Sequence, residues 1–264
     1  MATVKDVYRY LDEKAPFYSQ SGFDNSGFLV GRTDKEVKRI LIALDITESV
    51  VNEAAELRAD LIVSHHPVIW DAPKSITDES ILGRKLLGLL ENGIAAICAH
   101  TNLDAARGGV NDALAARLGL SDTVLLKTYG IYRDGTEYGI EQVGILQGEP
   151  ICLIEFADLV KSLLGSNGVR YVDSGRPVHK VAVGGGSCSS SIKDVAAAGC
   201  DTFVTADVKY DGFLDAKALG LNLIDAGHYP TENLVCPVLV DWLKTRFPNV
   251  EVLLSKHKEV FNYL

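Results

Sequence analysis

The sequence predicts an α/β protein made of two intertwined, duplicated α/β repeats, with mixed sheets covered by helices. Three observations lead to this fold class: short apolar runs typical of buried strands, helix-period segments between them, and a pattern that recurs at a constant spacing of 141 residues. Strands that are apolar along their whole length are covered on both faces, as in parallel or mixed sheets. The 264 residues suffice to bury such a core without staples.

The first half of the chain contains three predicted strands, at 40–44, 61–63 and 94–97. The segment after the first strand carries Val50, Val51, Ala54 and Ala55 at the spacing of a helix with one apolar face. Strands that alternate with helices in this way are typical of βαβ units.

The second half repeats this order, and residues 39–66 align without gaps on residues 180–207. Its strands are predicted at 181–183, 203–204 and 221–224. Any two βαβ units resemble each other, but here the third strand of each half is followed by a histidine and, four residues later, a carboxylate. We therefore expect a duplication, with a first repeat at 1–125 and a second, intertwined with it, at 126–264.

Residues 126–177 are the least regular part of the chain. They contain weak strand patterns at 142–146 and 151–156, interrupted by glycine and proline.

Composition limits the classes of function. Twenty-six basic and 35 acidic residues give a formal charge of −9, which makes nucleic acid an unlikely partner. The amino terminus lacks the apolar stretch of a signal peptide, and no apolar run approaches the roughly 20 residues that cross a bilayer. We expect a cytoplasmic protein with no membrane partner. The five cysteines are scattered singly, so a transition-metal site would use histidine and carboxylate.

Three short clusters that follow predicted strands carry candidate metal ligands. The ligands are His65, His66, Asp104, His228 and Glu232. Sites in open α/β sheets form beyond the carboxyl ends of strands, so these clusters are expected to converge. Adjacent histidines at a strand end are expected to point to opposite sides, one to each of two ions roughly 3.5–4 Å apart. Glu232 has the longer carboxylate and suits a bridge between the ions.

His100 is the candidate catalytic residue. It would carry protons, although the roles of ligand and of orienting group stay open on the residues alone. Pro230 disfavours a continuous helix through His228, so a loop that enters a helix near Thr231 is expected.

Two glycine-containing segments read as turns. The run 184–191 follows a strand and opens a helix, but it matches no phosphate-binding motif, and the turn-and-cap interpretation is favoured. Asp24, Asn25 and Gly27 also have the spacing of a plain turn.

Donor sets of histidine and carboxylate suit two divalent ions per chain, zinc, iron or manganese. A pair of such ions generates hydroxide from water at neutral pH and clamps a substrate oxygen. Hydrolysis is the reaction class that follows most directly.

Five segments, in this order, resemble the signatures of one known family, the dinuclear-metal family called NGG-interacting-factor-three-like or GTP cyclohydrolase I type 2. They are residues 23–31 (FDNSGFLVG), 64–67 (SHHP), 100–104 (HTNLD), 108–112 (GGVND) and 225–232 (DAGHYPTE). The resemblance runs from about residue 5 to the carboxyl end. Phe23 stands where the family usually has tryptophan, and the stretch 205–211 departs from the pattern around Asp207.

The resemblance implies a ring-like homohexamer with metal sites facing an interior cavity. It also implies that His66 and Asp104 match the ligands of one ion, His65 and His228 those of the other, and that Glu232 touches both. Its enzyme name implies hydrolytic opening of the guanine imidazole ring of GTP, so a nucleotide or another phosphate-containing small molecule is the expected partner. No guanine-reading or triphosphate-binding motif is visible. The alternative is a non-catalytic, metal-binding hexameric assembly or regulatory protein.

Overall fold

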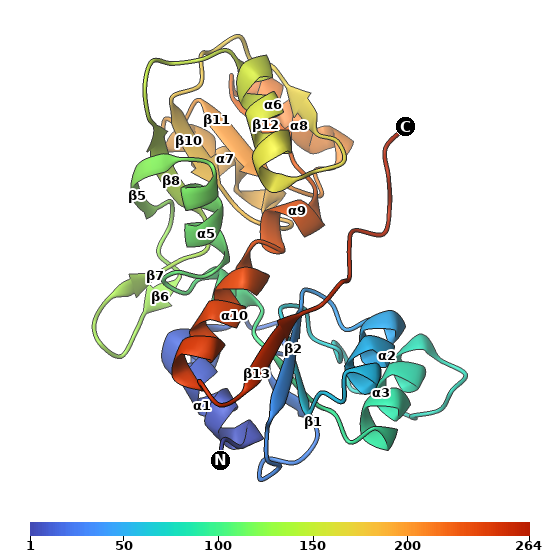
Figure 1. The fold of residues 1–264 in the computed structure, drawn as a ribbon. Helices are drawn as coiled ribbons and strands as arrows, with labels where there is room; N and C mark the ends of the chain where they lie inside the picture. Colours follow the sequence, from blue (N-terminus) through green and yellow to red (C-terminus); the bar gives the residue numbers. More distant parts are fainter. The chain divides into compact units, whose positions relative to one another are not determined.

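The computed structural model describes residues 1–264, which divide into two compact units (Figure 1). The first unit contains residues 1–107 and 235–258, and the second contains residues 108–234 and 259–264. The chain therefore leaves the first unit and returns to it near its carboxyl end. The boundary between sequence repeats at 125 and 126 stays a prediction, while the predicted class of helix-covered mixed α/β sheets is confirmed.

The first unit has one five-stranded sheet in the order β1-β4-β3-β2-β13, in which only β1 is antiparallel to its neighbour. Its elements are α1 (Val4–Lys14), η1 (Phe17–Ser19), β1 (Gly27–Val30), β2 (Arg39–Ala43), α2 (Glu48–Glu56), β3 (Leu61–Ser64), α3 (Ile81–Glu91), β4 (Ala95–Cys98), α4 (Thr101–Asp104), α10 (Val235–Arg246) and β13 (Glu251–Leu254).

Helices cover both faces of this sheet, which explains why its central strands are apolar throughout. Figure 1 shows α2 and α3 on one side and α1 and α10 on the other. Leu41 and Ile62 pack with Val50 of α2 and Leu89 of α3 in one buried cluster. Polar side chains fix where these helices begin, as at α1, where Thr3 and the N3 carboxylate form a capping box.

The second unit has a six-stranded sheet in the order β5-β8-β10-β11-β12-β9, with a parallel centre and antiparallel edges, and a separate β6-β7 hairpin. Its elements are α5 (Val110–Arg117), β5 (Leu120–Leu125), β6 (Gly130–Ile131), β7 (Glu137–Tyr138), β8 (Gln142–Leu146), α6 (Leu153–Leu164), β9 (Arg170–Val172), β10 (Lys180–Val183), η2 (Ser189–Ser191), α7 (Ile192–Ala197), β11 (Thr202–Thr205), α8 (Tyr210–Ala218), β12 (Asn222–Asp225) and α9 (His228–Glu232).

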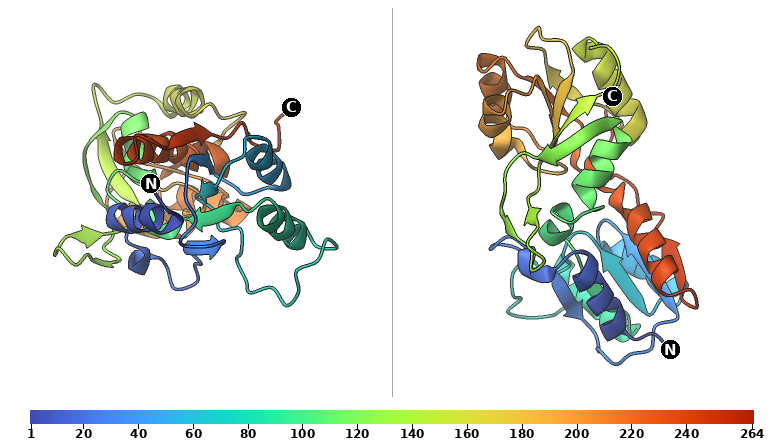
Figure 2. Two further views of the ribbon diagram at one scale, coloured as in Figure 1. Left: turned by 60° about the horizontal axis from the view of Figure 1, so that its bottom comes forward. Right: turned by 90° about the vertical axis from the view of Figure 1, so that its left-hand side faces the viewer.

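Helices also lie on both sides of this sheet (Figure 2). On one face Val181 and Val204 pack against α5 and α6, where Phe156 is almost fully buried. On the other, Ala182 and Phe203 pack against α7 and α8.

The 141-residue spacing found in the sequence returns as a shared strand register. Ile40 pairs with Leu61 in the first unit, and Val181 pairs with Thr202 in the second. A buried or half-buried aspartate precedes the second strand of each pair. Asp60 accepts backbone hydrogen bonds at the start of β2 from residues 38 and 39, and Asp201 accepts the same bonds at the start of β10 from residues 179 and 180.

The segment 151–156 is a helix start and not the weak strand that its residues suggested. Helix α6 begins at Leu153, and the Glu155 carboxylate accepts from the backbone N–H of Cys152 in a capping box. Leu153, Phe156, Ala157 and Val160 have the spacing of a buried helix face. The other weak pattern, 142–146, coincides with β8.

None of the helices is both long enough and apolar enough to span a lipid bilayer.

Candidate metal centre

His65 and His66 lie just beyond the carboxyl end of β3 and do not point to opposite sides. Their ring centroids are 5.0 Å apart. The strand ends at Ser64, whose hydroxyl donates to the carbonyl of His66, so the backbone bends and the alternation of a strand no longer applies. His65 and His66 both belong to a group of side chains that could hold a single ion, and their division between two ions stays a prediction.

His100 is the N-cap of the short helix α4, which follows β4, and Asp104 is the last residue of that helix. The residues are four positions apart, and the amide of Asp104 donates to the carbonyl of His100, which places both side chains near one face of the turn. The His100 ring lies 5.1 Å from that of His65 and 5.5 Å from that of His66. Nε2 of His65 lies 3.5 Å from Oδ1 of Asp104. The first unit thus brings four predicted site residues together.

Each histidine of this group has its Nδ1 held by an oxygen. Nδ1 of His65 lies 2.9 Å from the carbonyl oxygen of Ala99, that of His66 lies 2.8 Å from Asp45, and that of His100 lies 2.9 Å from Asp24. These oxygens are acceptors, so Nδ1 carries the proton in each ring. Such contacts orient metal-binding imidazoles and leave Nε2 for the ion.

Asp24 is the buried anchor of this arrangement. Besides His100 it accepts hydrogen bonds from the backbone N–H of Thr101 and the hydroxyl of Ser26. Burial alone would raise the pKa of Asp24, but the hydrogen bonds from His100, Thr101 and Ser26 hold it well below its usual range. The carboxylate is therefore charged and faces the His100 ring permanently.

The second unit carries the other two predicted ligands on α9. This helix begins at His228, so the predicted loop at that residue is wrong. Proline is tolerated at Pro230 because the third helical position needs no intrahelical donor. His228 and Glu232 are one turn apart, and Nε2 of His228 lies 3.0 Å from Oε2 of Glu232.

His228 also has its Nδ1 held, by Asp207 at 2.7 Å. Burial alone would lower the pKa of His228, but the carboxylates of Glu232 and Asp207 raise it to about 9. Without metal the ring therefore carries a proton on each nitrogen, and a metal ion at Nε2 would displace one of them.

A glycine makes room for these two side chains. Gly186 has a φ of +63°, and a Cβ at this position would collide with Oε1 of Glu232 and lie 3.2 Å from Nε2 of His228. Its N–H donates to the hydroxyl of Thr231, which ties the glycine loop to α9. The run 184–191 is thus a turn, as predicted, and it forms a wall of the candidate centre. The predicted cap is wrong, because neither Cys188 nor Ser191 makes a side-chain capping hydrogen bond.

The donors of the candidate centre fit a divalent metal ion. They are imidazole nitrogens and carboxylate oxygens with no thiolate, the set that suits zinc, iron and manganese. The ligand atoms of His65, His66 and His100 lie within 4.8 Å of one another. These three imidazoles of the first unit, with their Nδ1 contacts in place, are enough donors for one ion.

Four contributors were missed in the sequence: Asp24, Asp45, Asp207 and Gly186. Asp24 lies in a turn pattern and 76 residues from its partner His100, so spacing carries no signal for it. Asp207 lies in the stretch that departs from the family pattern, and its contact with His228 gives it a role that the departure had obscured.

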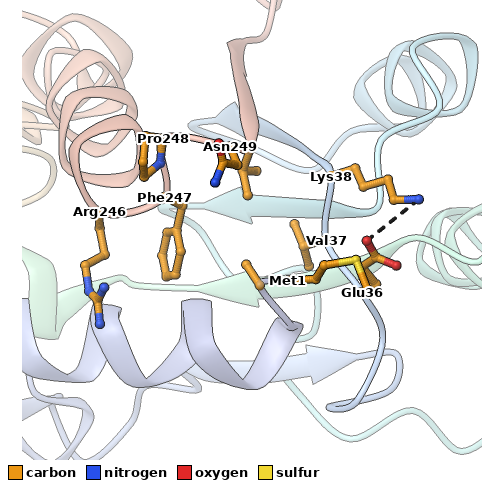
Figure 3. Close-up of a pocket in the computed structure, with 10 residues that line it drawn as sticks. Met1, Glu36, Val37, Lys38, Arg246, Phe247, Pro248 and Asn249 are labelled. Carbon is orange, nitrogen blue, oxygen red and sulfur yellow. Dashed lines mark ion pairs between the residues drawn. The ribbon is translucent and has the colours of Figure 1, made fainter.

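A pocket of about 310 Å³ in the first unit contains none of the predicted site residues (Figure 3). Phe247 and Val37 line it, and its charged side chains include Lys38, which pairs with Glu36 at 3.7 Å. It offers no histidine and is distinct from the candidate centre.

Comparison with known proteins gives one consistent answer. The model of the family described as Duf34/NIF3 (NGG1p interacting factor 3) matches residues 2–260. A Clostridium perfringens protein named GTP cyclohydrolase 1 type 2 homolog is 35% identical over 99% of both chains.

Solved structures agree with this. A Bacillus cereus protein related to NIF3 is 26% identical with a TM-score of 0.93, covering 100% of this chain and 99% of its own. A Staphylococcus aureus protein is 30% identical with a TM-score of 0.90 at the same coverage.

Proposed function

Because this chain belongs to the Duf34/NIF3 family, we propose that it is a dinuclear, divalent-metal-dependent hydrolase of the kind its relatives' name, GTP cyclohydrolase 1 type 2 homolog, describes. Its substrate would be a nucleotide or a related small molecule. The observation that carries the proposal is the shared state of His65, His66, His100 and His228, each with Nδ1 held by an oxygen. Imidazoles are held in this way at metal sites.

The five predicted ligands would share two ions. We assign His66 and Asp104 to one ion, His65 and His228 to the other, and Glu232 to both. When bound, two such ions make water acidic enough to act as a nucleophile at neutral pH and polarise a substrate oxygen. The remaining steps belong to the protein's own side chains.

His100 is assigned the transfer of protons in the two-ion protein. The buried charge of Asp24 fixes its Nδ1–H, so Nε2 is the atom that accepts a proton and returns it to the leaving group. Trp70 lies edge-on to the same ring at a centroid distance of 5.1 Å and shields one side of it from water. Both contacts support a proton-transfer role for this imidazole.

We propose a cytoplasmic location and, on the family resemblance, a homohexamer. The alternative, a metal-binding assembly without activity, differs from the hydrolase in one respect. Its ions would hold the oligomer together without turning over any substrate.

The test begins with metal analysis of the purified protein, where two transition-metal ions per chain are expected. Turnover of GTP, other nucleotides and phosphate esters is then screened with added manganese, zinc or iron against a metal-stripped control. Glu232→Ala should lose the second ion and with it all turnover, whereas Glu149→Ala, at an exposed carboxylate, should lose neither. Full metal occupancy in Glu232→Ala would contradict the bridging role.

Absence of turnover with every substrate, together with dissociation of the oligomer on chelation, would instead support the metal-binding assembly. Sedimentation or light scattering before and after chelation provides that second measurement.

A further inference from the structure

The first unit contains a set of three imidazoles that does not depend on the second unit. His65, His66 and His100 come from the ends of two adjacent parallel strands, β3 and β4. Their ring centroids lie 5.0–5.5 Å apart, and their ligand nitrogens lie within 4.8 Å of one another. Small side-chain rotations would bring three nitrogens at this spacing to the roughly 2.0–2.1 Å at which imidazole binds zinc.

The hydrogen bonds of these rings already favour a cation. The acceptors of His66 and His100 are the carboxylates of Asp45 and Asp24, and the acceptor of His65 is the carbonyl of Ala99. A carboxylate behind an imidazole makes Nε2 a better donor and adds negative charge next to the ion. Neither carboxylate belongs to the ligand set implied by the family, so this pattern is a separate feature of the first unit.

We propose that the first unit binds one divalent ion through His65, His66 and His100 alone, and that this one-ion form precedes the two-ion form. Three histidines with an open fourth position form a common zinc site. His100 is then a metal ligand in the one-ion protein. It is free to transfer protons only after the second ion arrives and the carboxylates of Asp104 and Glu232 take over.

Charge explains the change of ligands. A single dication can be bound by three neutral imidazoles, two of which are hydrogen-bonded to the carboxylates of Asp45 and Asp24. A second dication a few ångströms away adds repulsion, which anionic donors placed between the two ions relieve. Asp104 lies 3.5 Å from Nε2 of His65 and is the nearest such donor in the first unit. It is therefore the competitor of His100, and the experiment must separate the two.

The first experiment uses the unaltered protein. Metal-stripped wild-type protein receives half an equivalent of zinc per chain, and X-ray absorption counts the imidazoles around the ion. Three imidazoles are expected, and fewer than three would overturn the proposal. Because no side chain is changed, the result does not depend on whether any variant folds.

The second experiment removes the donors of the second unit with His228→Ala/Glu232→Ala. This variant should keep one ion per chain. Added in this background, His100→Ala should weaken zinc binding at least about tenfold. Loss of a group that only hydrogen-bonds to a ligand costs about 10–100-fold in metal affinity, and loss of the ligand itself should cost no less. Asp104→Ala should change it less than about threefold, and His179→Ala, at an exposed histidine, should change nothing.

Trp70 reports where the ion binds, because it touches the His100 ring. The chain has two tryptophans, so Trp242→Phe leaves Trp70 as the only one, and cobalt(II) in the three-imidazole site should quench its fluorescence. Loss of the ion from the double variant, or dependence on Asp104 and not on His100, would overturn the proposal. Neither outcome involves turnover, so a failed substrate screen would count against the hydrolase and not against this site.

Discussion

Four histidines of the candidate centre each have Nδ1 hydrogen-bonded to an oxygen, but the oxygens belong to different kinds of group. His65 uses a main-chain carbonyl, whereas His66, His100 and His228 use carboxylates. A carbonyl fixes the tautomer only, while a carboxylate also contributes charge. The three carboxylate-backed rings should therefore be the ones most sensitive to neutralisation of their partners.

The replacement Asp24→Asn tests this sensitivity. It keeps an acceptor oxygen for His100 but removes the negative charge, so the affinity for the first zinc ion should fall about 10–100-fold. Isothermal titration of metal-stripped protein measures it. Asp34→Asn, at an exposed aspartate, is the matched control; equal affinities in the two variants would show that the buried charge is irrelevant to metal binding.

Gly186→Ala should impair metal binding at the candidate centre, while Gly199→Ala should not. Both glycines have positive φ, +63° and +74°, so both replacements carry a backbone cost of roughly 1–2 kcal/mol. Only at Gly186 does the new methyl group collide with the Glu232 carboxylate, since nothing lies within 4 Å of a Cβ at Gly199. Thermal unfolding with and without metal, and metal content per chain, distinguish strain from collision. Equal metal content in the two variants would show that the Glu232 side chain can move away from the new methyl group without loss of metal binding.

At the scale of residues, the sequence shows which side chains could carry the chemistry but not the path of the backbone that brings them together. Histidine and carboxylate in three clusters are visible in any reading of the chain. The mutual approach of His65 and His66 is not, because it depends on a bend that starts immediately after Ser64. The partnership of Asp24 with His100 depends on a long-range contact that no local spacing encodes.

At the level of elements, one aspartate links the strands of each parallel pair of the repeat, β2–β3 and β10–β11, by accepting backbone hydrogen bonds. Asp201 is buried, accepts from two backbone amides at the start of β10 and from the Thr202 hydroxyl. Asp60 makes the equivalent backbone contacts but is more exposed and pairs with Lys35. Because a buried donor left without its acceptor costs more than an exposed one, the two sites should differ in strength.

Asp201→Ala should therefore lower the free energy of unfolding by about 1–3 kcal/mol, and Asp60→Ala by less. Urea denaturation of the metal-free proteins measures both. A larger loss at Asp60 would mean that exposure does not govern the strength of these ties.

Helices and strands could be predicted where a single sequence pattern, such as a continuous apolar run, decides the local structure. Continuous apolar runs identified the central strands of both sheets. The run that starts at Ile151 is apolar too, and only the capping contact of Glu155 with Cys152 shows that it opens a helix. The start of α9 was misjudged because proline was weighed as a helix breaker, although it occupies the first turn.

For the whole molecule, the proposed metal centre would make protons and metal ions compete at His228. Its pKa in the folded, metal-free protein is raised to about 9, above the ordinary value of 6.5. The stabilisation from the charged ring beside Glu232 and Asp207 is therefore complete below pH 6.5 and is lost as the pH rises through 9. Metal affinity changes in the opposite direction, because binding must displace the proton.

The difference in unfolding free energy between metal-free wild type and His228→Gln, measured from pH 6 to pH 10, should accordingly shrink as the pH rises. With saturating zinc the stability of the wild type should instead increase over pH 6–9. A pH-independent difference would place the pKa of His228 near its ordinary value.

The return of the chain to its first unit has a consequence for synthesis on the ribosome. Strand β13 pairs with β2, and α10 packs against both, yet neither exists until almost the entire polypeptide has been made. Until then, the nascent first unit has an unpaired β2 edge and an apolar sheet face that α10 does not yet cover. Residues 108–234, by contrast, form almost all of the second unit and can fold before the first unit is complete. Truncation by about thirty residues at the carboxyl end should for this reason yield chains that aggregate through the amino-terminal sheet.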